Sequence, residues 1–203
     1  MSKRTFFFLV GFLSLALAGS IAAGYWIVSG GRIIGAESST ADLVGGPFTL
    51  TDETGAPLSN EDLKGRYMMV FFGYTYCPDV CPTTLTVMTQ ALDLLDPKVA
   101  AQVEPVFITI DPARDTAPAL GDYSQHFHDK IHYLTGTPEQ ISDVARAYRV
   151  FFQKVESAEF SDYLMDHSTI TYLMGPDGRY VSHFGFDTTP EDIAKDLTKR
   201  IAG

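Results

Sequence analysis

Cysteine is scarce in this chain, which has only Cys77 and Cys81 among its 203 residues. Two thiolates do not by themselves complete a structural zinc site, which usually takes four protein ligands. Basic residues are also few: 15 lysines and arginines against 25 aspartates and glutamates give a net charge of −10. Without a basic stripe to neutralise phosphates, the protein is not expected to bind nucleic acid. Low-complexity tracts and internal repeats are absent as well, as in an ordinary globular domain.

One long hydrophobic run is present, and it lies near the N-terminus. Residues 6–28 are almost wholly apolar and, as a helix, would measure about 34 Å, enough to span a bilayer core of about 30 Å. Lys3 and Arg4 precede the run, which places the N-terminus in the cytoplasm and the rest of the chain outside. We therefore predict a single transmembrane helix at residues 1–30, a linker at 31–46 and a folded domain at 47–203.

A cleaved signal peptide is the alternative interpretation of this run, because Ala16-Leu17-Ala18 offers a small-residue cleavage site. The apolar stretch continues beyond that site through Tyr25 and Trp26, which are typical of an interfacial anchor, and this favours the uncleaved helix. The short N-terminus has no arginine- and serine-rich presequence, which favours a bacterial inner-membrane protein over a mitochondrial one. We expect a single-pass protein whose domain lies in the periplasm.

The hydrophobic pattern of the domain predicts alternating strands and helices. Tyr67–Gly73 and Glu104–Ile110 are continuous apolar runs, typical of strands buried on both faces. The order βαβαβ, followed by an antiparallel hairpin and a last helix, predicts a thioredoxin-like α/β fold with an N-terminal β-strand extension. The remaining expected strands are Pro47–Thr51, Ile131–Leu134, Ser168–Met174 and Tyr180–Phe186; a short helical turn is expected at Leu58–Leu63, and helices are expected from Pro82, over Thr116–Phe127, Thr137–Tyr148 and Thr189–Ile201.

Both cysteines fall where a buried strand is expected to end and a helix to begin. Orphan backbone N–H groups and the helix dipole favour thiolate over thiol at such a place. Outside the cytoplasm, Cys77 and Cys81 would normally be found as a disulfide. The loop between them is too short for that bond to constrain the unfolded chain much, so a chemical role is expected rather than a structural one. Thiolates in this position either exchange electrons or hold a soft metal.

The metal interpretation favours copper. Cysteines at i and i+4 can present both sulfurs to one point if the chain between them coils as a helical turn. Two thiolates can hold Cu(I), and an imidazole would complete a trigonal site. His167 is the candidate third ligand because it lies just before the strand expected beside the one that delivers Cys77. Asp166 is then a candidate acceptor that fixes the imidazole tautomer, although a solvated loop carboxylate is the alternative.

The other four histidines are less suited to this role. His126 and His128 are expected on different helix faces, and His132 falls in the next expected strand, so these three are interpreted as surface residues. His183 alternates with apolar residues in an outer hairpin strand and is expected to be structural.

Three separated motifs resemble the Sco (SenC) family of copper chaperones, and the resemblance extends from about Phe48 to Ile201. The motifs are Phe72–Pro82, Asp111–Thr116 and Asp166–Thr169 with Tyr172 and Leu173. Their order along the chain makes the resemblance specific, which a lone C-x-x-x-C would not be.

This resemblance implies a membrane-tethered, thioredoxin-like protein that binds Cu(I) or Cu(II) through Cys77, Cys81 and His167. It also implies a role in assembly of the binuclear copper centre of cytochrome c oxidase. The partners would be the copper-receiving oxidase subunit and a thioredoxin-like reductant or another copper chaperone.

A thiol–disulfide oxidoreductase is the main alternative, with Cys77 and Cys81 as the attacking and resolving thiols. Two features count against it. Such enzymes usually have C-x-x-C, whereas three residues intervene here, and no proline lies between Pro138 and Pro176, where they usually carry a cis-proline. A thiol peroxidase is disfavoured because Thr75 lies two residues before Cys77 rather than three. Reductase activity can coexist with metal carriage, so the sequence leaves open whether the protein is an enzyme.

Two tyrosines near the cysteines and the Asp111–Thr116 motif each allow two interpretations. Tyr74 and Tyr76 either shield the site or belong to the core. Asp111–Thr116 has the composition of ordinary turn-and-cap chemistry after a strand. Within it, Arg114 is free to pair with an acidic partner or to lie near the copper site.

Overall fold

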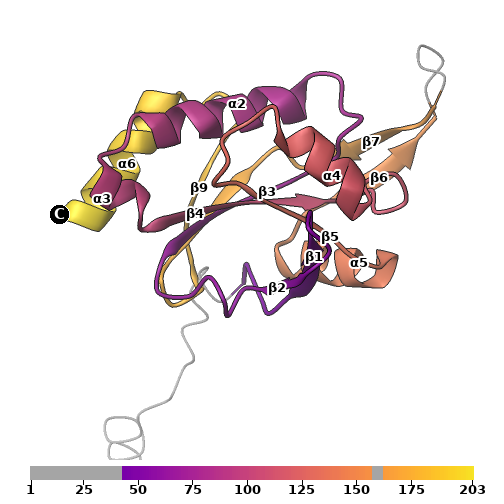
Figure 1. Ribbon diagram of the computed structural model, residues 1–203, viewed down its shortest axis with the longest axis horizontal. Coiled ribbons are helices and arrows are strands. Elements are labelled where there is room, and N and C mark those ends of the chain that lie inside the picture. The colour runs from indigo at the N-terminus through magenta and orange to yellow at the C-terminus, as the bar shows by residue number, and fades with distance from the viewer. Residues whose placement is uncertain (1–42, 157–161) are drawn as a thin grey trace, which may run out of the picture. The chain divides into compact units, whose positions relative to one another are not determined.

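The computed structural model describes residues 43–156 and 162–203 (Figure 1). The transmembrane helix predicted at residues 1–30 and most of the predicted linker lie outside these described residues. Within the described part of the chain, no helix combines the length and the apolar character needed to cross a membrane.

A seven-stranded mixed sheet forms the centre of the domain (Figure 1). Its strands are β1 (Thr49–Asp52), β2 (Pro57–Ser59), β3 (Tyr67–Gly73), β4 (Val103–Thr109), β5 (His132–Thr135), β8 (Thr171–Met174) and β9 (Tyr180–Phe184). They lie in the order β2-β1-β5-β4-β3-β8-β9, with β3, β4 and β5 parallel to one another and every other neighbouring pair antiparallel. The apolar runs predicted as central strands are β3 and β4, and β4 is buried along its whole length.

Helices cover both faces of this sheet. They are α2 (Val80–Asp93), α3 (Pro97–Ala100), α4 (Ala117–Ser124), α5 (Pro138–Ala147) and α6 (Pro190–Ala202). Figure 1 shows α2, α4 and α6 on one face and α5 on the other. The threonines predicted to begin helices do so: Thr116, Thr137 and Thr189 each cap a helix that has proline in its first turn, and Thr137 forms a capping box with Gln140.

Two local predictions are wrong. The short helical turn expected at Leu58–Leu63 is replaced at its start by β2, which pairs with β1 at the edge of the sheet. The reason is the turn between these strands, where the Asp52 carboxylate accepts hydrogen bonds from the backbone N–H groups of Thr54 and Ala56 and so fixes a hairpin. The strand expected from Ser168 begins only at Thr171.

A second, two-stranded sheet was not predicted. β6 (Phe152–Val155) and β7 (Leu164–His167) pair with each other and with no strand of the main sheet among the described residues. This β6–β7 hairpin projects from the domain beside the end of β3 (Figure 1). His167, expected in a loop, is therefore the last residue of a strand, opposite Phe152.

Candidate metal centre

Cys81 packs directly beneath the end of β3. It lies in the first turn of α2 and is fully buried. Gly73 ends β3, and a Cβ atom added there would lie 2.8 Å from the Cys81 sulfur and 2.9 Å from the ring of Phe107. Only glycine lets the strand approach the sulfur this closely.

Cys77 precedes α2 and uses the free N–H groups of the helix start. The backbone N–H of Cys81 points at the Cys77 sulfur at 3.4 Å. The pKa of Cys77 falls far below its ordinary value, to about 4, chiefly because the Cys81 thiol donates to its sulfur. His167 and the backbone N–H groups of Cys81 and Asp79 add to this effect, while burial opposes it. Cys77 is therefore a thiolate at neutral pH.

The pKa values of the two thiols shift in opposite directions because the sulfurs share one proton. Donation of its S–H to Cys77 raises the pKa of Cys81, and burial and the negative charge on Cys77 raise it further. Without a metal, the pair is best described as a half-exposed thiolate next to a buried thiol. Both cysteines are free in the structure.

His167 approaches the sulfurs from the β6–β7 hairpin. Its Nε2 lies 3.5 Å from the Cys81 sulfur, and its Nδ1 lies 2.8 Å from the backbone oxygen of Ser168. A carbonyl oxygen can only accept, so Nδ1 donates to Ser168, and Nε2 is the ring nitrogen that faces the sulfurs. Phe71 and Tyr74 contact the imidazole edge-on, with ring centroids 6.2 and 5.9 Å away.

The structure thus brings together the three residues that the sequence singled out. Ligand atoms of Cys77, Cys81 and His167 all lie within 4.8 Å of one another. No fourth histidine, cysteine or carboxylate from the described residues joins this group. Two sulfurs and one imidazole suit copper, whereas a closed zinc site would need a fourth protein ligand.

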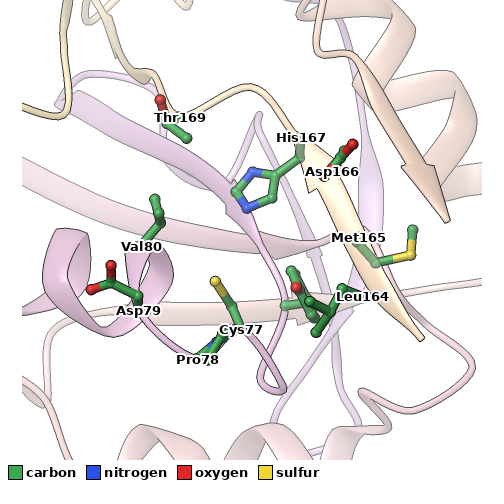
Figure 2. A pocket seen from close by; sticks show the side chains of 10 residues that line it. Cys77, Pro78, Asp79, Val80, Leu164, Met165, Asp166, His167 and Thr169 are labelled. Atoms are coloured by element: carbon green, nitrogen blue, oxygen red, sulfur yellow. The ribbon is translucent and has the colours of Figure 1, made fainter. Parts of the chain in front are cut away.

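The group opens to solvent on one side. A cleft of about 220 Å³ is lined by Cys77 and His167, together with the residues from Cys77 to the start of α2 at Val80 on one side and β7 residues on the other (Figure 2). Cys81 lies behind this cleft and does not line it.

Comparison with known proteins identifies the family. The SCO1/SenC family model matches residues 36–202. The chain belongs to the SCO1/SenC family. A human relative named protein SCO1 homolog, mitochondrial, is 42% identical over 156 residues, which cover 76% of this chain and 52% of the relative. The chain thus spans about half the length of that relative.

Solved Sco structures share the fold. The copper-bound ScoI of Bradyrhizobium japonicum superposes with a TM-score of 0.72 and 44% identity, covering 78% of this chain and 99% of that one. A structure of BsSco, described as a member of the Sco family of cytochrome c oxidase assembly proteins with a disulfide switch, is 25% identical with a TM-score of 0.59, covering 79% of this chain and 94% of that one. These similarities confirm the predicted thioredoxin-like α/β domain and its family.

The other four histidines were predicted to lie outside the site, and they do. His132 contacts Glu104 at 2.7 Å, and His183 contacts the Tyr180 hydroxyl at the same distance. His128 lies beyond the end of α4, where its Nδ1 accepts from the backbone N–H of Lys130. None of these belongs to the metal-ligand group, and neither does His126.

Asp166 does not fix the imidazole tautomer. It precedes His167 on β7, where successive side chains point to opposite faces, and Ser168 supplies the acceptor instead. Tyr74 is buried against His167 and lines the cleft, so it belongs to the core and also covers the site. Tyr76 is 60% exposed and does not line the cleft, so neither interpretation applies to it.

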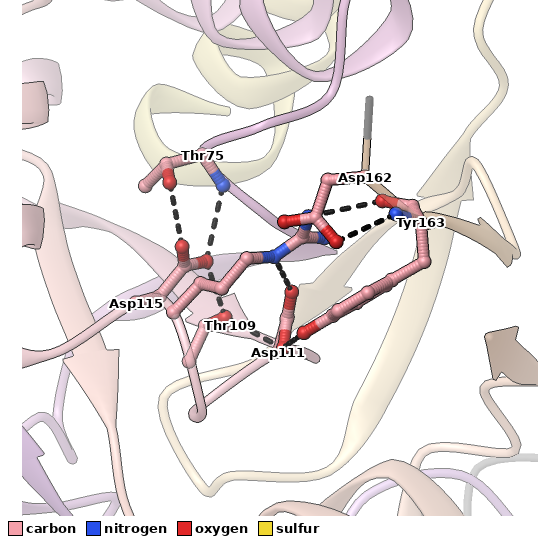
Figure 3. A network of polar contacts seen from close by, with 7 residues as sticks. Thr75, Thr109, Asp111, Asp115, Asp162 and Tyr163 are labelled. Atoms are coloured by element: carbon pink, nitrogen blue, oxygen red, sulfur yellow. Dashed lines mark hydrogen bonds and ion pairs between the residues drawn. The ribbon is translucent and has the colours of Figure 1, made fainter. Parts of the chain in front are cut away.

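Sequence reasoning did not assign the role of Asp115 in supporting the cysteine loop. Asp115 is fully buried after β4 and accepts hydrogen bonds from the backbone N–H and hydroxyl of Thr75 and from the hydroxyl of Thr109 (Figure 3). Thr75 lies two residues before Cys77, so this carboxylate ties the cysteine loop to β4. The signal was present in the Asp111–Thr116 motif, but only the fold shows what the carboxylate reaches.

Replacing Asp115 with alanine should lower the free energy of unfolding by about 1–3 kcal/mol, because the buried Thr109 hydroxyl and the part-buried donors of Thr75 would lose their acceptor. Urea denaturation of the metal-free domain measures this.

Asp52→Ala is the matched control, since Asp52 also accepts three hydrogen bonds but in an exposed turn. Its loss should cost less than about 1 kcal/mol, because water can replace the acceptor. Equal costs for the two variants would contradict a special role for Asp115.

Proposed function

We propose that this protein is a membrane-tethered copper metallochaperone that binds Cu(I) or Cu(II) through Cys77, Cys81 and His167. The observation that carries the proposal is the convergence of two sulfurs and one imidazole nitrogen within 4.8 Å. Soft thiolates hold copper, while three ligands leave the ion open to attack by a recipient's thiolates, which can displace the chaperone's ligands stepwise.

The recipient is proposed to be the copper-receiving subunit of cytochrome c oxidase. Support comes from BsSco, which is described as a member of a family of oxidase assembly proteins. We propose that the chain serves assembly of the binuclear copper centre there, and that a thioredoxin-like reductant or another copper chaperone supplies it.

The cellular arrangement is proposed from the sequence. Residues 1–30 would anchor the protein in a bacterial inner membrane as a single helix, residues 31–46 would form a linker, and residues 47–203 would form the periplasmic copper-binding domain. The apolar run at residues 6–28 supports the anchor.

Copper titration of the reduced domain, starting at Glu37, tests the site. A chain that starts there should fold alone, because its counterpart in Bradyrhizobium was solved as a separate chain. The match covers 99% of that chain and 78% of this one. We expect one copper per chain, with a sulfur-to-Cu(II) charge-transfer band in the visible spectrum. Loss of a residue that only supports a ligand costs roughly 10–100-fold in metal affinity. His167→Ala removes a ligand itself, so it should weaken Cu(II) binding by more than this and should bleach the band.

His183→Ala is the matched control, since this histidine contacts Tyr180 rather than the sulfurs. It should leave affinity and spectrum unchanged. An unchanged spectrum and stoichiometry in His167→Ala would show that the three-ligand site is wrong.

A second candidate function is a thiol–disulfide oxidoreductase that reduces the cysteines of the copper-receiving protein. The lowered pKa of the half-exposed Cys77 favours it, because a thiolate there can attack a disulfide and Cys81 can resolve the product. The two functions are compatible, since both need the same thiols in the reduced state.

A further inference from the structure

The hairpin that carries His167 has little support of its own. β6 and β7 have four residues each and pair only with each other among the described strands. An isolated two-stranded hairpin is marginally stable in water. The position of the imidazole relative to the sulfurs therefore depends on whatever fastens this hairpin to the rest of the domain.

At its base, the hairpin is closed by backbone contacts. Ser168 donates its N–H to the oxygen of Phe151, and its hydroxyl accepts from the N–H of Phe151. At the end of β7, the Tyr74 ring contacts the His167 imidazole edge-on, with ring centroids 5.9 Å apart. These contacts lie on the His167 side and leave the start of β7 to be held by other groups.

Arg114 holds the start of β7. Its Nη1 donates to the backbone oxygen of Tyr163 at 2.9 Å and lies 3.4 Å from the Asp162 carboxylate (Figure 3). Its Nε contacts the Asp111 carboxylate at 2.5 Å. One guanidinium thus joins the loop after β4 to the two residues directly before β7.

The ring of Tyr163 closes the same cluster. It lies under the Arg114 guanidinium, 3.7 Å from ring centroid to Cζ, and its hydroxyl donates to Asp111 at 2.9 Å. The Arg114 Cζ also lies 4.7 Å from the ring centroid of Tyr76, which belongs to the cysteine loop. The cluster of Arg114, Asp111, Asp162 and Tyr163, hereafter the arginine lock, therefore touches both the element with His167 and the element with Cys77.

A docking role for Arg114 fits these observations less well. Its side chain is only 13% exposed, and Nε and Nη1 are both engaged within the chain. A guanidinium offered to an acidic partner would need exposed, uncommitted donors.

The geometry points to Arg114 as a positioning residue for copper binding: by fastening the start of β7 to the loop after β4, it sets where the His167 imidazole stands relative to the two sulfurs. Arg114 touches no ligand atom and acts through the hairpin. The inference rests on the proposed function, because it concerns the third ligand of the same site.

Arg114→Gln tests the inference. In the metal-free domain, hydrogen exchange at the backbone amides of β7 should become faster, because the strand loses its anchor. Cu(II) affinity, measured by competition with a chelator, should fall roughly tenfold, as for loss of a ligand's supporting contact. The Cu(II) electron paramagnetic resonance spectrum should also change, because the imidazole coordination is perturbed.

A double-mutant cycle with His167→Ala separates positioning from general destabilisation. If Arg114 acts through His167, then Arg114→Gln should have no further effect on copper affinity once His167 is alanine. Additive losses would overturn the inference. Arg146→Gln is the matched control, because its ion pair with Asp143 is exposed on α5, and it should change neither exchange in β7 nor copper affinity.

Two milder variants test the inference if Arg114→Gln does not fold. Arg114→Lys keeps the charge but loses the planar fork, and Tyr163→Phe removes only the hydroxyl that donates to Asp111. Both should weaken Cu(II) binding in the same direction, and unchanged affinity in both would overturn the inference. If His167→Ala itself leaves copper binding intact, the proposed site fails; if His167→Ala weakens binding and the Arg114 variants do not, only the arginine lock fails.

Discussion

Replacing Cys81 with serine is expected to abolish tight copper binding while leaving Cys77 able to form mixed disulfides. A serine hydroxyl is a poor ligand for a soft ion, so the site would keep one sulfur of two. The loss in Cu(I) affinity should exceed about 100-fold, the upper end for loss of a supporting residue. Cys77 keeps its position at the start of α2 and its exposure to the cleft, so its sulfur can still attack a disulfide.

Two measurements check this result. Competition with a chromophoric Cu(I) chelator gives the affinity, and mass spectrometry after incubation with oxidised glutathione gives the mixed disulfide. Because Cys81 is the only thiol available to resolve that disulfide, it should accumulate in Cys81→Ser and not in the wild type.

Cys77→Ser is the matched partner variant. It should lose both properties, because the remaining thiol is buried and its pKa is raised. Copper affinity that survives in Cys81→Ser would contradict the two-sulfur site, and equal glutathione labelling of both variants would contradict the assignment of Cys77 as the attacking thiol.

Alkylation of the metal-free, reduced domain should show a rate at Cys77 that is nearly constant from about pH 5.5 to pH 8. A pKa of about 4 makes Cys77 a thiolate throughout this range, whereas an ordinary thiol reacts about tenfold faster for each pH unit up to its pKa near 8.5. Iodoacetamide labelling followed by peptide mass spectrometry measures each cysteine separately. Cys81 should remain unlabelled in the folded domain, because its sulfur is buried.

Cys81→Ala supplies the control for the cause of this reactivity. The Cys81 thiol is the largest contribution to the lowered pKa of Cys77, so removing it should move the onset of labelling to higher pH. A wild-type rate that keeps climbing tenfold per unit between pH 6 and pH 8 would contradict a preformed thiolate.

The central fold and the cysteine pair could be predicted from the sequence because their signals are local. The apolar runs of β3 and β4 are long enough to indicate buried strands, and threonine followed by proline marks helix starts such as those of α5 and α6. The chemistry of Cys77 and Cys81 likewise follows from a strand end that meets a helix start, which is visible in one continuous segment.

The surroundings of His167 could not be predicted in the same way. β7 has only four residues, and its burial pattern shows no clean alternation of buried and exposed positions. Its pairing partner, β6, precedes it by about a dozen residues with polar side chains at its centre. Such strands depend on tertiary contacts, and the contacts of the arginine lock with the residues before β7 are not visible in any local pattern. Treating the segment as a loop also led to the wrong acceptor, since Asp166 could face the imidazole only if the chain were not extended.

The unequal burial of the two sulfurs would give the proposed ligand exchange a fixed order. An ion held between the three ligand atoms would be open to an incoming thiolate only through the cleft beside Cys77 and His167, since Cys81 lies beneath the end of β3 with no exposed surface. Stepwise transfer would then release the rim ligands early and the Cys81 sulfur last. Gly73, by allowing that sulfur under the strand, would then determine which bond to the metal is the final one to break.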